Sequence, residues 1–151
     1  MPIGMKSCRI SALPTGNCSR AAISQRVEEA AALTPVTSSA PTLGAANCWN
    51  AVTPDGRFVY TSNAGSATVS GFSIAGDGTL TPLPGTIGGA NPSGATNLDI
   101  TVSSDGKFLY ALNSGNGTVG IFAIQKDGQL VSIASADGIS AAAGFNGIAA
   151  D

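Results

Sequence analysis

The sequence has 151 residues, of which 43% are hydrophobic and only 11% are charged, so one globular domain with a sizeable core is expected. The formal net charge is −2 and no basic cluster occurs, which argues against nucleic acid or an anionic membrane as a partner. No apolar run approaches the roughly 18 residues of a membrane span, and no continuous apolar stretch marks a secretory signal. A cytoplasmic protein without membrane contact is therefore expected.

Residues 1–26 show neither strand alternation nor a helical stripe, so they have no assigned fold and are expected to be poorly packed. They contain Cys8 and Cys18, and the third cysteine is Cys48. Three cysteines at these spacings fit neither a disulfide framework nor a paired zinc site, so free thiols are expected. Truncation or an altered reading frame upstream would explain why repeat-like order begins only at Val27.

Residues 27–46 are predicted to hold the end of one repeat unit and the connection to the next. The stretch from Val27 to Val36 aligns with the stretch from Ile74 to Leu83 at an offset of 47 residues. The alignment predicts the end of a third strand followed by an outer strand, although the Asp-Gly of the intervening turn is missing.

The next two units, residues 47–96 and 97–145, are copies of each other at an offset of 50 residues. Between Asn47–Leu80 and Asn97–Leu130, 15 of the 34 paired residues are identical without a gap, whereas chance would give roughly two or three. Each unit has four short segments separated by glycine turns, which predicts a four-stranded antiparallel meander. Strands are expected near residues 50–53, 58–63, 68–74 and 80–83, and again fifty residues later.

The last residues, 146–151, are predicted to form the first strand of a following unit, because Ile148–Ala150 aligns with Ile100–Val102 at an offset of 48. Repeats of about 50 residues with this strand pattern are typical of propeller blades, which must stack to bury their faces. The sequence therefore predicts an all-β chain: a partial β-propeller with two complete four-stranded antiparallel blades and parts of two flanking blades. Self-association through the exposed blade faces is expected.

Both blades carry the same run of motifs. Each has a Pro-Asp-Gly-Arg or Ser-Asp-Gly-Lys turn, then Phe-Val-Tyr or Phe-Leu-Tyr, then Asn-x-Gly, a Thr-Val strand and a closing Asp-Gly-x-Leu. With these motifs, residues 27–151 resemble the lactonase-type seven-bladed propellers, which include bacterial 6-phosphogluconolactonases and fungal carboxymuconate cyclases and are related to YVTN-repeat proteins. The resemblance implies that the parent fold hydrolyses a sugar lactone or related cyclic ester without metal or cofactor. It also implies that this chain is the last third of such a ring.

Candidate site residues lie where each first strand begins, because these segments line the mouth of a propeller channel. Lactone hydrolysis needs a base to activate water and donors to hold the developing oxyanion. Asp99 is the candidate general base, and the candidate substrate-binding residues are Asn47, Trp49, Asn97 and Asn146. The alternative, which we favour for the carboxylate and the amides, is that they cap strand ends by hydrogen bonding to the backbone. For Trp49, packing in the core is as good an interpretation as stacking on a sugar ring.

The remaining polar residues suggest no further chemistry. The sequence has no histidine, which excludes Ser-His-Asp, Cys-His and HExxH sites, and no residue set fits a metal or a cofactor. Cys48 is expected to be a small buried hydrophobe, and Arg57 and Lys107 to be solvated turn residues. Two functions stay open: a lactonase-like enzyme that is inactive as an isolated chain, or a non-catalytic propeller fragment that serves as an interaction or structural module.

Overall fold

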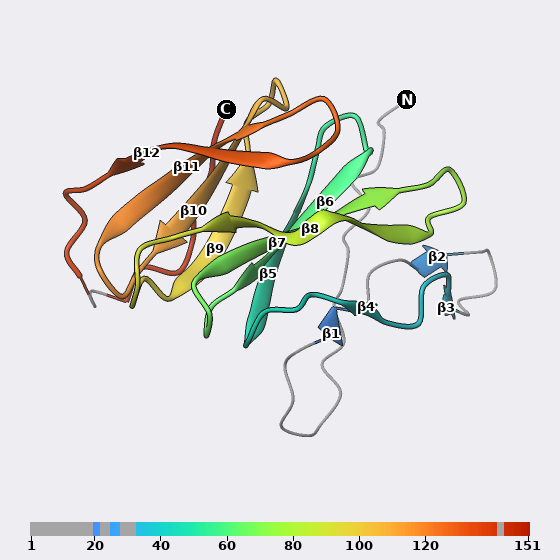
Figure 1. Cartoon of the computed structure of the whole chain (residues 1–151), viewed down its shortest axis with the longest axis horizontal. Coiled ribbons are helices and arrows are strands. Elements are labelled where there is room, and N and C mark those ends of the chain that lie inside the picture. Colours follow the sequence, from blue (N-terminus) through green and yellow to red (C-terminus); the bar gives the residue numbers. More distant parts are fainter. Residues whose placement is uncertain (1–19, 22–24, 28–32, 142–143) are drawn as a thin grey trace.

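The described part of the computed structural model comprises residues 20–21, 25–27, 33–141 and 144–151 (Figure 1). Within these ranges the chain forms twelve β-strands in four antiparallel sheets, and no helix. In particular, the described residues include no helix long and apolar enough to cross a membrane. Cys8 and Cys18 lie outside the described ranges, as does most of the segment 1–26. The prediction of an all-β chain is confirmed.

Two four-stranded sheets form the body of the molecule, and they are the two predicted blades. Each is a meander in which neighbours in sequence are neighbours in the sheet. Contacts between β5 and β9 and between β8 and β12 bring the blades together. The first blade contains β5 (Asn47–Val52), β6 (Phe58–Asn63), β7 (Thr68–Ile74) and β8 (Leu80–Ala90), and the second contains β9 (Asn97–Val102), β10 (Phe108–Asn113), β11 (Thr118–Ile124) and β12 (Leu130–Ala136).

The turn between the first two strands of each blade is fixed by its Asp-Gly pair. In the first blade, Asp55 Oδ1 accepts hydrogen bonds from the Thr53 hydroxyl at 2.6 Å and from the Arg57 N–H at 3.0 Å. Gly56 follows the carboxylate with φ of 71°, a conformation that other residues adopt only at a cost. The second blade repeats this turn with the same φ at Gly106. The repeated tetrapeptide therefore sets where β6 and β10 begin.

The main core lies between the two blades. Successive residues of β6 point to opposite faces, so Phe58 and Tyr60 pack against the second blade while Val59 packs on the other side. On the second blade, the face that carries Leu109 and Phe122 packs against Phe58 and Tyr60. The Tyr60 hydroxyl also donates a 2.6 Å hydrogen bond to the Gly128 carbonyl of the second blade. Blade-to-blade packing therefore combines apolar burial with one buried polar link.

Two short antiparallel strand pairs, one nested inside the other along the chain, precede the first blade. β1 (Arg20–Ala21) pairs with β4 (Ala40–Pro41), and β2 (Gln25–Val27) pairs with β3 (Leu33–Pro35). The pairs Val27↔Leu33 and Ile74↔Leu80 are equivalent at the offset of 47 residues that the sequence indicated. These strands therefore correspond to the two outer strands of a preceding blade. Their pairing begins at Arg20, N-terminal to residue 27, where the sequence predicted the propeller region to start.

The far face of the second blade is only partly covered. Residues 144–151 contain no strand, so the strand predicted at 146–151 is not formed. A first strand needs a second strand for its ladder, and here the Ile148 N–H instead donates to the Asp99 carboxylate at 2.9 Å. Farther out on this face Ile133 is 52% exposed, whereas Leu83, its counterpart in the first blade, is 8% exposed.

Candidate functional site

The first strand of each blade begins with an asparagine and a bulge. In β5 the pairing passes from Asn47↔Asn63 to Asn50↔Thr61 with a register shift. In β9 a register shift likewise leaves Leu98 without a partner in the ladder. Bulges redirect the side chains that follow them and are frequent beside functional sites. The residues at this edge are therefore turned out of the regular alternation of the strand.

Both asparagines at this edge bind backbone atoms. Asn47 donates from its amide nitrogen to the Thr61 hydroxyl and to the Ser62 carbonyl, the latter at 3.1 Å. Asn97 is fully buried and donates to the Thr68 carbonyl at 2.9 Å, which ties the second blade to the first. These contacts are those expected of residues that cap strand ends.

Asp99 is a buried carboxylate in β9, with 4% of its surface exposed. Its Oδ1 accepts from the Ile100 N–H at 2.8 Å and its Oδ2 from the Ile148 N–H at 2.9 Å. Burial raises the pKa of Asp99, and the two backbone donors oppose this rise only in part. A raised pKa suits a general base, and each oxygen keeps one acceptor site beside its backbone N–H, but the burial of the side chain leaves a water molecule little access.

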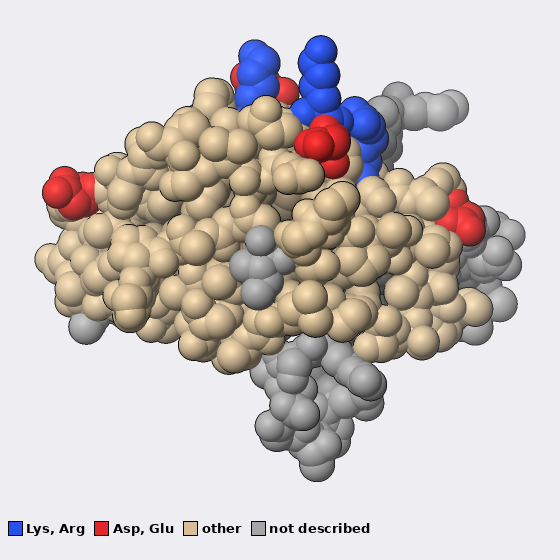
Figure 2. Space-filling model, viewed as in Figure 1, with Lys and Arg blue, Asp and Glu red and all other residues tan. Residues whose placement is uncertain are grey.

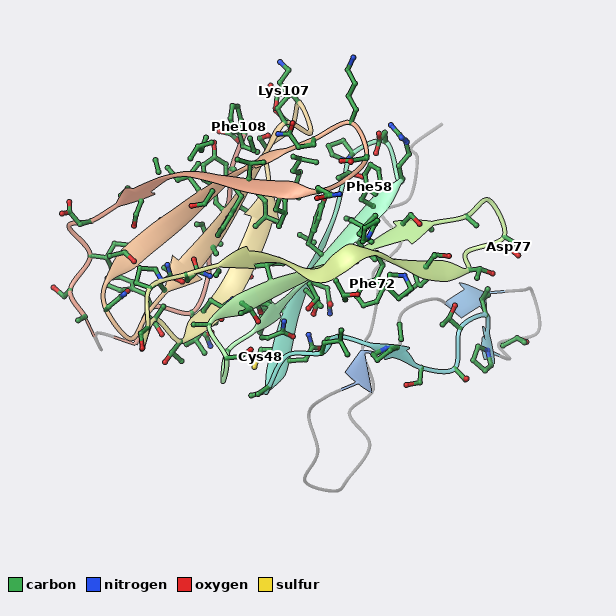
Figure 3. All side chains as sticks on the ribbon, in the orientation of Figure 1. Cys48, Phe58, Phe72, Asp77, Lys107 and Phe108 are labelled. Carbon is green, nitrogen blue, oxygen red and sulfur yellow. The ribbon has the colours of Figure 1, made fainter. Side chains whose placement is uncertain are left out.

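The bulge of β5 brings Cys48 and Trp49 to the surface. The thiol of Cys48 lies 3.3 Å from the Ala46 carbonyl and is exposed, so the prediction of a buried residue was wrong. Figure 3 shows Cys48 at the end of the first blade opposite to Lys107 and Phe108. Trp49 is 44% exposed, which excludes core packing, and its backbone N–H donates to the Ser62 hydroxyl at 3.0 Å. Asn146 is exposed too, two residues before Ile148.

A second pair of asparagines, which the sequence analysis left aside, lies buried at the same edge. Asn63 donates to the hydroxyls of Thr68 and Ser70, at 3.1 and 2.8 Å. Asn113 donates in turn to Asn91 Oδ1 and to the Thr118 hydroxyl. The signal was available, because Asn63 and Asn113 are identical residues of the repeat. The side-chain oxygens of Asn63, Asn97 and Asn113 have no hydrogen-bond partner among the described residues.

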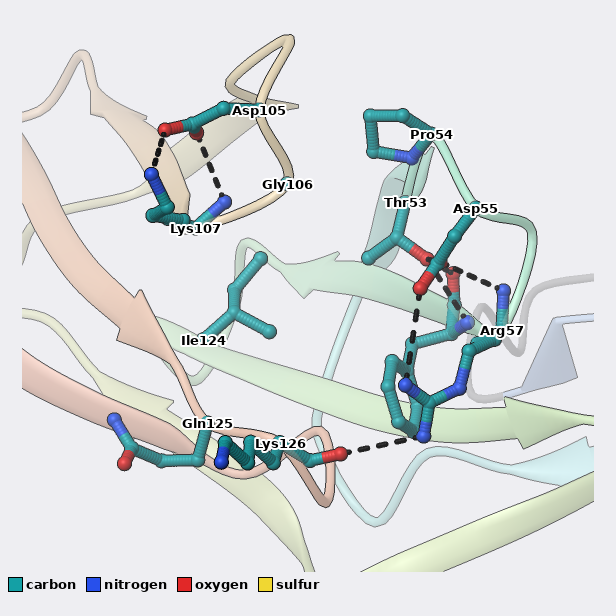
Figure 4. A pocket seen from close by; sticks show the side chains of 11 residues that line it. Thr53, Pro54, Asp55, Arg57, Asp105, Gly106, Lys107, Ile124, Gln125 and Lys126 are labelled. Carbon is teal, nitrogen blue, oxygen red and sulfur yellow. Dashed lines mark hydrogen bonds and ion pairs between the residues drawn. The ribbon is translucent and has the colours of Figure 1, made fainter.

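At the opposite edge of the blades there is a cavity of about 250 Å³ (Figure 4). It lies between the Asp-Gly turns of the two blades and the turn that precedes β12. Arg57 and Lys107 are exposed here, as predicted, and each pairs with the aspartate of its own turn, at 3.9 and 2.9 Å. Within the described ranges no group of three His, Cys, Asp or Glu side chains could hold a metal ion.

Comparison with known proteins identifies the fold. No protein-family model and no curated protein matches the sequence. Among solved structures, the periplasmic gluconolactonase PpgL of Pseudomonas aeruginosa superimposes with a TM-score of 0.63 and 21% identity over 80% of this chain and 36% of that one. A candidate 6-phosphogluconolactonase from Bacteroides uniformis gives a TM-score of 0.65 and 18% identity over 79% of this chain and 37% of that one. The chain has the fold of the lactonase-type propellers.

This fold does not by itself carry the activity. A protein of unknown function from Desulfotomaculum acetoxidans matches this chain equally well, with a TM-score of 0.62 and 22% identity over 74% of this chain and 33% of that one. In these three comparisons the chain spans only 33 to 37% of the other structure. Propellers that share a fold can host unrelated functions, so function has to be argued from the site.

Proposed function

We propose that these two blades belong to a propeller that hydrolyses a sugar lactone or a related cyclic ester, and that the 151-residue chain alone does not. The observation that carries the proposal is the position of Asp99. It supplies a buried carboxylate of raised pKa at the bulged start of a first strand, in a fold shared with a gluconolactonase structure. The partner is a small-molecule lactone, with no cofactor, nucleic acid or membrane.

Neighbouring residues give this edge the other parts that a lactone site needs. The indole of Trp49 is exposed, and an aromatic face can stack on a sugar ring. Asn146 is exposed and can donate from its amide to a developing oxyanion. Asn47 and Asn97 hold the two strand starts through backbone hydrogen bonds, so in this proposal they position the site and their amides are already engaged.

The lack of activity in the isolated chain follows from the same geometry. Each oxygen of Asp99 accepts one backbone N–H, and only 4% of the residue's surface is exposed, so water has little access to it. The chain also has no histidine that could act as the base instead. The residues that complete the site therefore come from other blades of the ring, in which 47–96 and 97–145 are successive units. We place that ring in the cytoplasm, whereas the similar Pseudomonas protein is periplasmic.

A non-catalytic, structural role is the second candidate, and one observation favours it. Among the described residues, the hydrogen bonds of Asp99 and of the Asn97 amide all join backbone atoms, as in strand caps without catalytic function. In that case the edge would hold the blades and the C-terminal segment in place, and no lactone would bind.

Ligand binding and turnover separate these candidates. Trp49 is the only tryptophan, so its fluorescence reports directly on this edge. With purified chain and δ-gluconolactone, the lactonase proposal expects saturable quenching without hydrolysis, and Trp49→Phe provides the blank. The absence of saturable quenching would favour the structural role. Metal-independent hydrolysis that falls by about 10² or more in Asp99→Asn would show instead that the chain is a complete enzyme.

A further inference from the structure

The cavity of about 250 Å³ gathers the positive charge of the described molecule. Arg57, Lys107 and Lys126 all line it, and they are the only cationic residues whose side chains the structure describes. Figure 2 shows the lysine and arginine side chains together at one edge of a surface that otherwise carries few charges. In a chain with a net charge of −2, this concentration of cations marks one place for an anionic ligand.

The cations come from both blades, and Arg57 is held in place. Its guanidinium lies over the Phe58 ring at 4.9 Å and donates to the Lys126 carbonyl at 3.3 Å, across the blade boundary. The Lys126 carbonyl takes one of its five N–H donors and the Asp55 carboxylate lies 3.9 Å from its Nη1, so donors of the fork are left for a ligand. A pre-positioned guanidinium loses less entropy on binding an oxyanion than a mobile one.

The two aspartates in the cavity wall are engaged with their own turns. Asp55 Oδ1 accepts from Thr53 and Asp105 Oδ1 from the Ser103 hydroxyl at 2.7 Å. These bonds lower the pKa of both carboxyls, that of Asp105 to about 2, so both are ionised at neutral pH. The lining then carries three positive and two negative charges, a net of +1. Asp127 lies outside the lining and accepts from the Gln129 N–H at 3.0 Å.

We propose that this inter-blade cavity binds a small oxyanion, the carboxylate or phosphate group of a soluble metabolite. Lys126 provides the charge that no carboxylate neutralises, since it takes part in no ion pair among the described residues. Arg57 and Lys107 provide directed N–H donors on either side of it. A carboxylate and a phosphate group both present pairs of oxygen atoms to which a guanidinium or an ammonium group can donate hydrogen bonds.

This site is separate from the proposed lactone site. β6 runs from Phe58 at the cavity to Asn63 at the opposite edge, a span of about 17 Å at 3.3 Å per residue. A ligand in the cavity therefore does not touch Asp99 or Trp49. Binding here can fail or succeed whatever happens at the other edge.

The test is a two-dimensional amide NMR titration of the purified chain with inorganic phosphate and, separately, with citrate. Sodium chloride at equal ionic strength corrects for screening. We expect saturable shifts at the amides of Arg57, Lys107 and Lys126. Saturation by phosphate alone identifies a phosphate ligand, and saturation by citrate alone a polycarboxylate. Shifts that sodium chloride reproduces, or that never saturate, would overturn the proposal.

Charge-matched variants make the test specific. Lys126→Gln removes one positive charge from the cavity and should weaken binding about five-fold, as for the loss of one exposed ion contact. Thr79→Glu changes the net charge by the same amount in the exposed turn of the first blade, outside the lining, and should leave the affinity within about two-fold. Equal weakening in both variants would indicate only a nonspecific charge effect and would refute the site.

Discussion

The hydrogen bond from Tyr60 to Gly128 should be a measurable part of the attraction between the blades. The Tyr60 side chain is fully buried, and its hydroxyl lies 2.6 Å from the Gly128 carbonyl of the neighbouring blade. Burial raises the pKa of this hydroxyl, so it stays protonated and able to donate across the working pH range. Tyr60→Phe keeps the ring and removes only the donor. Loss of a buried hydrogen bond costs about 1–3 kcal/mol when its partner is left behind.

The repeat supplies a matched control. Tyr110 is the other tyrosine of the chain and occupies the equivalent position in the second blade, on the partly covered face. Its hydroxyl has no hydrogen bond among the described residues, so Tyr110→Phe should change the free energy of unfolding by less than about 0.5 kcal/mol. Urea unfolding followed by circular dichroism and Trp49 fluorescence measures both variants. Thermal unfolding gives a second measurement, in which Tyr60→Phe should lower Tm by about 2–12 °C.

Two outcomes would refute this reasoning. If Tyr60→Phe unfolds at the same urea concentration as the parent chain, the link between the blades contributes nothing to stability. If both variants lose the same amount, the effect belongs to tyrosine at this strand position in general. A loss of cooperativity in Tyr60→Phe alone would support the bond as the link, because the two blades would then unfold separately.

Three further predictions address glycine geometry, acid stability and association. Gly128→Ala should cost more than about 2 kcal/mol, because φ is 85° and the new Cβ would lie 2.5 Å from a buried ring, whereas Gly138→Ala, at φ of 101° with open space, should cost clearly less in urea unfolding. The lowered pKa of Asp105 stabilises the folded chain at pH values above the ordinary pKa of 3.8, and this stabilisation is lost as the pH falls toward about 2. Ser103→Ala removes the main cause of the lowered pKa, so it should reduce the free energy of unfolding at pH 6 and flatten its decrease in acid. The chain should self-associate through the exposed face of the second blade, and Ile133→Lys should shift sedimentation velocity toward the monomer; a parent chain that is monomeric at all concentrations would contradict this.

The blades were predictable because the turn motifs that determine their strands are short stretches of sequence and occur in both repeats. An Asp-Gly turn sets the start of β6, and the same turn sets β10. The offset of 47 residues also predicted the end of a third strand and an outer strand before the first blade, and the pair Val27↔Leu33 lies at that offset from Ile74↔Leu80.

Departures from the prediction occur where a side chain depends on another segment. Cys48 is exposed because of a bulge, and an extra residue in a ladder leaves no clear mark in the sequence. Residues 146–151 match a strand in sequence, yet a strand forms only against a partner. Arg57 and Lys107 were correctly predicted as exposed, but their shared cavity arises from contacts between blades, which neither turn encodes alone.

The two blades have the same residue at the start of the first strand and different residues two positions later. Asn47 and Asn97 are identical, and both bind backbone atoms at the start of a first strand. Two positions later the first blade has Trp49 and the second has Asp99, although both strands contain the bulge. The fold therefore needs the asparagine and tolerates either side chain after it. An exposed indole and a carboxylate of raised pKa at equivalent positions are differences that packing does not require. We therefore propose that a ligand of the complete ring would contact these two side chains.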